Sequence, residues 1–272
     1  MIPKPSHYFM GIDPAPAIGI RSDDGVLVVL RASLKDSVEG LISVNAGDYK
    51  LEYVWAYRCR AMSGREWSGK IHQTQQRFSL TGICMDPNGG GNMIALEMNR
   101  TRQLIAGIEC DCTPICCPGD ALASAAFILS LFKRGDRGIE RLYPHLVGDD
   151  NLVDAQHVRM QEAIELGLLA MPVPWDERSN EERRRLEQTW SPEQIWALKM
   201  LSIGMHQLMG IQVATKDDGS WVFTRHGARQ FFATGKKDCA YAMCYAYLAF
   251  LIWMSGGELD GMEHNEAMSY VL

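Results

Sequence analysis

Two apolar runs that each end in Asp-Pro constrain the fold of this chain most strongly. Residues 8–13 end in Asp13 and residues 80–86 end in Asp86, and a proline follows each of them. Because proline lacks the backbone N–H that a central strand must donate, each strand should stop at its aspartate. The sequence therefore predicts two buried strands that each deliver a carboxylate to the edge of a sheet.

A third acid, Asp238, stands shortly before residues 240–254, which are apolar all round and predict a buried helix. We predict that Asp13, Asp86 and Asp238 form one carboxylate cluster, although they are far apart in the sequence. An Asp-Pro pair after a strand is also common turn chemistry, so each acid taken alone has this simpler explanation.

Clustered carboxylates repel one another unless cations neutralise them, and hard divalent ions such as Mg²⁺ prefer oxygen ligands. Two such ions can activate a water and stabilise the leaving oxygen of a phosphodiester. The cluster therefore predicts a two-metal site for phosphodiester cleavage. Asp13 would bridge the two ions, and Asp86 and Asp238 would each complete one site.

The order of the expected elements favours an α/β fold of the ribonuclease H-like type. An Asp-Gly turn at residues 22–25 predicts a hairpin that returns through the β-branched run 26–32. Residues 51–59 alternate as a third strand, and a helix that begins at Ser63 or Ser68 precedes the second aspartate strand. We expect a mixed sheet whose first three strands are antiparallel, flanked by helices.

We expect one domain over residues 1–272, with an inserted helical lobe over the polar, charge-rich stretch 133–192. Helical pieces of that lobe are expected near 154–166 and 181–188. The other expected elements are short helix 93–100, strand 103–110, helices 121–132 and 193–209, and a hairpin of 211–214 with 221–224.

Composition limits the class of protein. A net charge of −6 over 272 residues argues against a strongly basic nucleic-acid coat, although a carboxylate site is itself acidic. The N-terminus lacks the apolar core of a signal peptide, and residues 240–254 are too short to favour a membrane span. We therefore expect an intracellular, soluble protein. The clustered cysteines fit zinc spacing poorly and are expected to be ordinary buried thiols: Cys110, Cys112, Cys116 and Cys117.

Three segments resemble the acidic motifs of the nuclease domain of bacteriophage large terminases: residues 11–15 (GIDPA), 83–91 (ICMDPNGGG) and 235–242 (GKKDCAYA). The resemblance implies a ribonuclease H-like fold and cleavage of concatemeric viral double-stranded DNA during packaging, with two Mg²⁺ or Mn²⁺ ions. It implies a packaging ATPase domain or subunit, a small terminase and a portal as partners. It also implies action in the host cytoplasm, with no membrane.

Two departures from that family affect the expected site. The packaging ATPase that precedes the nuclease in full terminases has no counterpart here, so the chain is either an isolated domain or a separate subunit. The third motif often has paired acids, whereas Lys237 precedes Asp238 here. Asp149 and Asp150 are therefore rivals for the third position, ranked second because their surroundings are polar.

Basic groups near the motifs could hold DNA phosphates: Arg58, Arg60, Arg65, Lys236 and Lys237. A separate alternative is nucleotide binding by residues 64–71 (GREWSGKI), which nearly match the phosphate-binding loop G-x-x-x-x-G-K-[ST]. Ile71 replaces the hydroxyl that should hold Mg²⁺, which argues against that function. The remaining alternatives are another ribonuclease H-like nuclease, such as a junction resolvase, and a non-catalytic packaging scaffold.

Overall fold

The computed structural model of the chain describes residues 6–14, 25–36, 46–60, 62–86, 90–115, 160–210, 212–215, 221–224 and 238–254. Several predictions lie outside these residues: the extended segment 17–21, most of the turn at 22–25, helix 121–132, the rival acids Asp149 and Asp150, and the basic pair Lys236 and Lys237.

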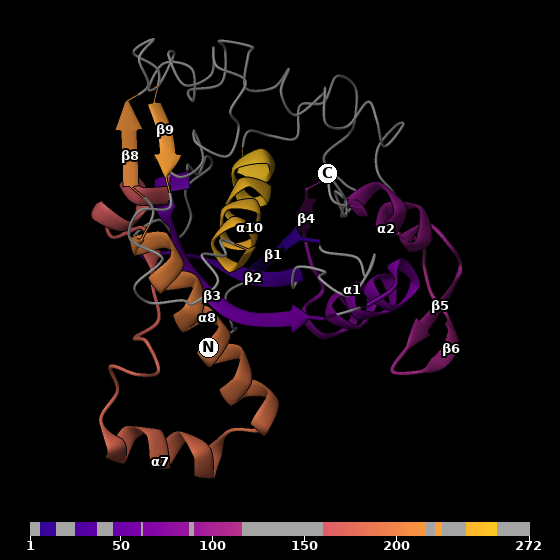
Figure 1. The fold of residues 1–272 in the computed structure, drawn as a ribbon, viewed down its shortest axis with the longest axis horizontal. Coiled ribbons are helices and arrows are strands. Elements are labelled where there is room, and N and C mark those ends of the chain that lie inside the picture. The colour runs from indigo at the N-terminus through magenta and orange to yellow at the C-terminus, as the bar shows by residue number, and fades with distance from the viewer. Residues whose placement is uncertain are drawn as a thin grey trace.

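A five-stranded mixed sheet forms the centre of the fold (Figure 1). Its order is β4 (Gly82–Met85), β1 (Ser6–Asp13), β2 (Gly25–Leu34), β3 (Tyr49–Cys59) and β7 (Leu169–Ala170). β1, β2 and β3 are antiparallel to one another, and β4 is parallel to β1. These strand directions confirm the ribonuclease H-like, mixed α/β fold class expected from the sequence.

The period of two along each strand divides the core between the faces of the sheet. Phe9 of β1 packs with helix α10 (Asp238–Met254) on one face, whereas Met10 and Ile12 pack on the other. There they contact α1 (Gly64–Phe78) and α2 (Gly91–Met98). The predicted apolar helix at 240–254 is thus α10, which lies across β1 and β2 (Figure 1).

Side-chain caps explain where three helices begin. Ser63, rather than Ser68, caps α1, and its side chain and Glu66 form a reciprocal capping box. The same motif at Ser179 starts α7 (Asn180–Thr189), and at Ser191 it starts α8 (Pro192–Met209). These helices confirm the predictions over 181–188 and 193–209.

A β-hairpin replaces the single strand expected over 103–110. It consists of β5 (Arg102–Ile105) and β6 (Ile108–Asp111), joined by Ala106 and Gly107 at φ angles of 50° and 82°. Both turn residues have a left-handed backbone conformation, as a type I′ hairpin turn requires. The second predicted hairpin is present as antiparallel strands β8 (Gln212–Thr215) and β9 (Trp221–Thr224).

The described part of the stretch 133–192 contacts the central sheet. Residues 160–165 are helical, and β7 pairs in parallel with β3. Met160, Ala163 and Leu169 belong to the core that contains α10. The division of the chain into one domain with an inserted lobe stays a prediction.

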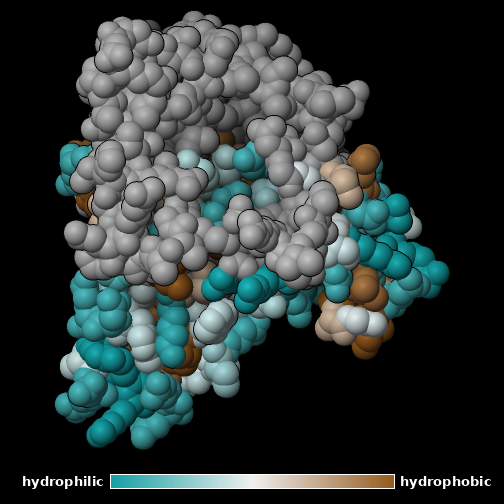
Figure 2. All heavy atoms as spheres, viewed as in Figure 1, coloured by the Kyte–Doolittle hydropathy of each residue, from teal (hydrophilic) through white to brown (hydrophobic). Residues whose placement is uncertain are grey.

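Hydropathy differs between the parts of the surface visible in Figure 2. The surface around α7 is hydrophilic, whereas apolar residues gather on α2 and the β5–β6 hairpin, where Met93, Leu96 and Ile108 are exposed. No helix among the described residues is both long and apolar enough to cross a membrane.

Candidate functional site

Asp13 and Asp86 end two neighbouring parallel strands. Ile12 of β1 is the register partner of Met85 of β4, and the Asp86 N–H donates to the Ile12 carbonyl oxygen at 3.1 Å. Adjacent strands lie about 4.8 Å apart, so the two acids stand side by side in one row of the sheet. The structure therefore brings together the two Asp-Pro strand ends that the sequence singled out.

Both acids occupy the face of the sheet that α10 covers. Alternation along β1 puts Asp13 on the same face as Phe9, and alternation along β4 puts Asp86 on the same face as Cys84. Phe9 and Cys84 both belong to the core cluster that contains α10. Asp13 and Asp86 are only partly buried, as expected at the rim of that core.

Gly11 allows α10 to approach this end of the sheet. A Cβ atom at Gly11 would lie 2.0 Å from the Ala242 carbonyl oxygen and 2.2 Å from the Ala246 nitrogen, so only glycine fits against the helix backbone. Asp238 is the first residue of α10, about one turn before Ala242. This contact therefore fixes the turn that carries Asp238 relative to the strand that carries Asp13.

The electrostatics of Cys239 connect the first and third acids. Burial raises the pKa of the Cys239 thiol to about 12, and the negative charges of Asp238 and then Asp13 add to the rise. Two carboxylates that both act on one buried thiol share its neighbourhood. Asp238 thus lies in the region of the β1 end.

Tyr245 is a neighbour of the acids that no motif in the sequence indicates. Burial raises the pKa of its phenol far above the usual range, and the charges of Asp86 and Asp13 raise it further. Tyr245 lies within an apolar helix, where neither periodicity nor a motif distinguishes it from core residues. Burial similarly raises the pKa of the Cys84 thiol, with a further contribution from Asp86.

Gly90 and Gly91 let α2 lie close to both strand ends. A Cβ atom at Gly91 would lie 1.9 Å from the Asp86 carbonyl oxygen and 3.5 Å from Cγ of Pro14. Gly90, directly before α2, has a φ angle of 102°, which L-residues rarely adopt. These two glycines therefore let α2 begin close to the acids.

The donor chemistry of this edge fits a hard divalent cation, since all three acids offer carboxylate oxygens. However, within the residues that the structure describes, no group of three or more His, Cys, Asp or Glu side chains is arranged to hold a metal ion. The structure shows that Asp13 and Asp86 lie next to each other. Their joint metal site with Asp238 stays a prediction, and the rivals Asp149 and Asp150 lie outside the described residues.

Two of the predicted DNA-binding residues stand near the same edge. Asp13 pairs with Val26 of β2, and Val26 pairs with Arg58 of β3, so Arg58 occupies the same row two strands away, at about 10 Å. Arg60 follows directly after β3, and both arginines are exposed. A role in DNA binding stays a prediction for them.

The segment that resembled a phosphate-binding loop is helical. Residues 64–70 form the first half of α1, and the Ser63 side chain caps its N-terminus. Trp67 and Ser68 are buried, and the Lys70 ammonium lies 3.8 Å from the centre of the Tyr57 ring. The loop of free backbone amides that would cradle a phosphate is therefore not formed there.

The described cysteines of the cluster differ from the expectation of buried thiols. Cys110 and Cys112 are free and only partly buried, because they lie on and just after the exposed hairpin strand β6. Cys116 and Cys117 lie outside the described residues.

Comparison with known proteins gives a limited likeness. No family model and no curated protein matches the chain. The large terminase nuclease from thermophilic phage G20c is similar, with a TM-score of 0.43 and 14% identity over 89% of this chain and 82% of that one. The same nuclease with bound magnesium gives a TM-score of 0.39 and 14% identity over 89% and 81%. Both are large terminase nucleases, the family that the three acidic motifs resemble.

Proposed function

We propose that the chain is a metal-dependent endonuclease that cleaves double-stranded DNA during phage DNA packaging. The observation that carries the proposal is that Asp13 and Asp86 end adjacent parallel strands on the face covered by α10. The resemblance of three segments to terminase acidic motifs also supports it, and two of those motifs contain these strand ends.

In this proposal Asp13, Asp86 and Asp238 hold one or two Mg²⁺ or Mn²⁺ ions. When bound, such ions activate a water and stabilise the leaving oxygen of a phosphodiester. Asp13 lies on the more central strand, between β4 and β2, so it is the acid best placed to be shared by two ions. Buried Cys84, Cys239 and Tyr245 surround the acids with weakly polar groups, which strengthens the attraction between carboxylates and a cation.

Basic residues at this edge would bind the DNA backbone. Arg58 and Arg60 are exposed at the β3 end, in line with the acids across the sheet. Lys236 and Lys237 directly precede Asp238 in the sequence and would add charge beside the third acid. Arginine and lysine contacts to phosphates position a duplex without reading its sequence.

The partners in this proposal follow from the motif resemblance. They are a packaging ATPase domain or subunit, a small terminase and a portal, in the cytoplasm of the infected host.

The test is cleavage of supercoiled plasmid in Mg²⁺ or Mn²⁺ by the wild type and by Asp13→Asn. The substitution keeps the size of the side chain and removes the charge that holds a cation. We expect at least a 100-fold loss of cleavage with no loss of thermal stability. Asp111→Asn is the matched control, since Asp111 is 91% exposed on the distant hairpin. Wild-type-like cleavage by Asp13→Asn would contradict the proposed site.

Other DNA substrates in the same cleavage assay separate the proposed endonuclease from a junction resolvase and from a packaging scaffold. A junction resolvase would prefer branched DNA to plasmid, and a packaging scaffold would bind DNA without cutting it. Cleavage of linear duplex by the wild type, abolished by chelation, is the result expected for the proposed function.

A further inference from the structure

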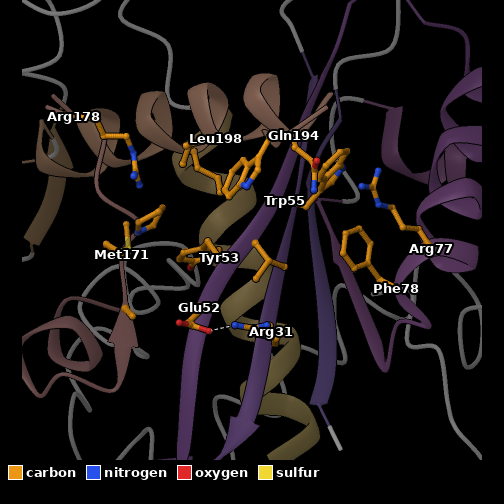
Figure 3. A pocket seen from close by; sticks show the side chains of 15 residues that line it. Arg31, Glu52, Tyr53, Trp55, Arg77, Phe78, Met171, Arg178, Gln194 and Leu198 are labelled. Carbon is orange, nitrogen blue, oxygen red and sulfur yellow. Dashed lines mark hydrogen bonds and ion pairs between the residues drawn. The ribbon is translucent and has the colours of Figure 1, made fainter. Parts of the chain in front are cut away.

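A pocket of about 460 Å³ lies beside β3 (Figure 3). Residues of β2, β3, β7, α8 and the end of α1 line it. Arg31 lines the pocket and is the register partner of Tyr8 on β1. Tyr8 lies five residues before Asp13 and on the opposite face of the sheet. That separation is about 17 Å along the strand, so the pocket is distinct from the proposed nuclease site. Its volume is within the usual range for small-molecule sites.

The wall of the pocket carries a concentration of positive charge. It contains Arg31, Arg77 and Arg178, and among the lining residues Glu52 is the one acid. Glu52 pairs with Arg31, and Glu193, which does not line the pocket, pairs with Arg77 at 3.1 Å, so Arg178 carries the positive charge of the wall that no ion pair among the described residues offsets, in a chain whose net charge is −6. An anionic ligand is therefore the kind that this wall would attract.

Arg178 keeps donors available, whereas Arg31 does not. Nε of Arg31 has no hydrogen-bond partner within the described structure, but its burial puts it out of reach of a ligand in the pocket. Arg178 donates through Nε to the Val173 carbonyl oxygen at 3.2 Å, and its terminal nitrogens make no hydrogen bond to any described residue. Because a guanidinium presents several donors in a fixed plane, Arg178 can still bind an anion such as a phosphate.

Aromatic rings form the rest of the wall. Trp55 is covered by the Arg77 guanidinium, which lies 3.8 Å from the ring centre, and Phe78 lies beside it (Figure 3). Trp190 is 40% exposed and lines both this pocket and a neighbouring hollow over α8. An exposed indole of this kind offers a face on which a flat ring can stack.

A negative charge and a flat ring occur together in a nucleotide. We propose that this pocket binds a nucleotide, with its phosphate at Arg178 and its base against Trp190. The nucleotide is either free or one unit of a single strand, since both present the same chemistry. This binding site does not depend on the proposed nuclease function.

The test is calorimetric titration with dAMP in the presence of EDTA, so that no divalent ion can hold the nucleotide at the acidic edge. We expect saturable binding that weakens at least tenfold in Arg178→Gln and in Trp190→Ala. Arg184→Gln is the matched control, because Arg184 is exposed on α7 and does not line the pocket. Asp13→Asn should bind dAMP as the wild type does, which separates this site from the nuclease site.

Titrations with other ligands identify the source of the nucleotide. Inorganic phosphate alone and deoxyadenosine alone should each bind more weakly than dAMP if the charge and the ring both contribute. A short single-stranded oligonucleotide that binds more tightly than dAMP would identify a DNA strand as the occupant, and equal or weaker binding would identify a free nucleotide. No saturable binding, or binding unchanged in both folded pocket variants, would overturn the proposal; a melting curve of each variant establishes that it is folded.

Discussion

Gly11 of the first strand and Ala242 of the last described helix are in backbone contact. A methyl group at Gly11 would lie 2.0 Å from the Ala242 carbonyl oxygen, and the obstacle is backbone rather than a flexible side chain. The glycine therefore sets the separation between β1, which carries Asp13, and α10, which carries Asp238.

We expect Gly11→Ala to destabilise the fold by about 3 kcal/mol, because overpacking against backbone forces a displacement of strand or helix. Gly47→Ala is the matched control, since a Cβ atom at Gly47 would meet nothing within 4 Å. Urea unfolding of the two variants measures the difference. Equal stability of Gly11→Ala and the wild type would show that the helix can move away without cost.

Substitution of the third acid separates Asp238 from its rivals. If Asp238 holds a cation, Asp238→Asn should lose cleavage and should be stabilised less by Mn²⁺ than the wild type, because a ligand stabilises only the state that binds it. Without metal its melting temperature should be unchanged or higher, since one like charge has been removed. The same two measurements on Asp149→Asn and Asp150→Asn are the comparison. If one of these variants lost cleavage and Asp238→Asn did not, that residue would be the third metal ligand in place of Asp238.

Lys70→Ala should leave nucleotide binding unchanged. Lys70 lies within helix α1, where it rests on the Tyr57 ring, donates to Gln73 Oε1 at 2.9 Å and lies 3.8 Å from Glu193, so its removal costs these local contacts, of which the cation–π contact contributes about 0.5–1 kcal/mol. Titration with ATP in EDTA measures binding. If saturable ATP binding disappeared in this variant, α1 would have to be reconsidered as a phosphate site.

Stability should fall as the pH is lowered from 7 to 5. Burial lowers the pKa of both His7 and His72 below the ordinary value of 6.5. The unfolded chain therefore takes up protons first as the pH falls through 6.5, and the folded state loses stability relative to it.

His72→Gln should have a shallower loss over the same range, since glutamine does not titrate and can still donate to the Met98 carbonyl oxygen that His72 contacts at 3.2 Å. Urea unfolding at pH 7, 6 and 5 measures the two slopes. Parallel slopes for His72→Gln and the wild type would mean that His72 contributes nothing to the acid sensitivity.

Local patterns in the sequence were sufficient to predict much of the fold. Strands β1, β2 and β3 and helix α10 were expected because alternation, β-branched residues and an all-apolar run are visible within a few residues. The β5–β6 hairpin was read as one strand, because its turn contains Ala106 at positive φ, a conformation that alanine rarely adopts. The two-residue strand β7 has no local pattern and exists through its pairing with β3.

Local patterns in the sequence also predicted part of the candidate site. An apolar run ending in Asp-Pro indicates a carboxylate at a strand end, but the pairing of β1 with β4 is a long-range contact that no local pattern contains. The closeness of Tyr245 to Asp13 and Asp86 depends on how α10 is rotated over the sheet. A helix that is apolar all round does not reveal that rotation.

The contact between Gly11 and α10 has a consequence for synthesis of the protein. The ribosome makes Asp13 and Asp86 long before Asp238, and the strands can carry only two of the three acids until α10 docks on β1. Under the proposed function, unfinished or misfolded copies would lack cutting activity. The host chromosome and the viral genome would then be protected from partly made enzyme without any separate inhibitor.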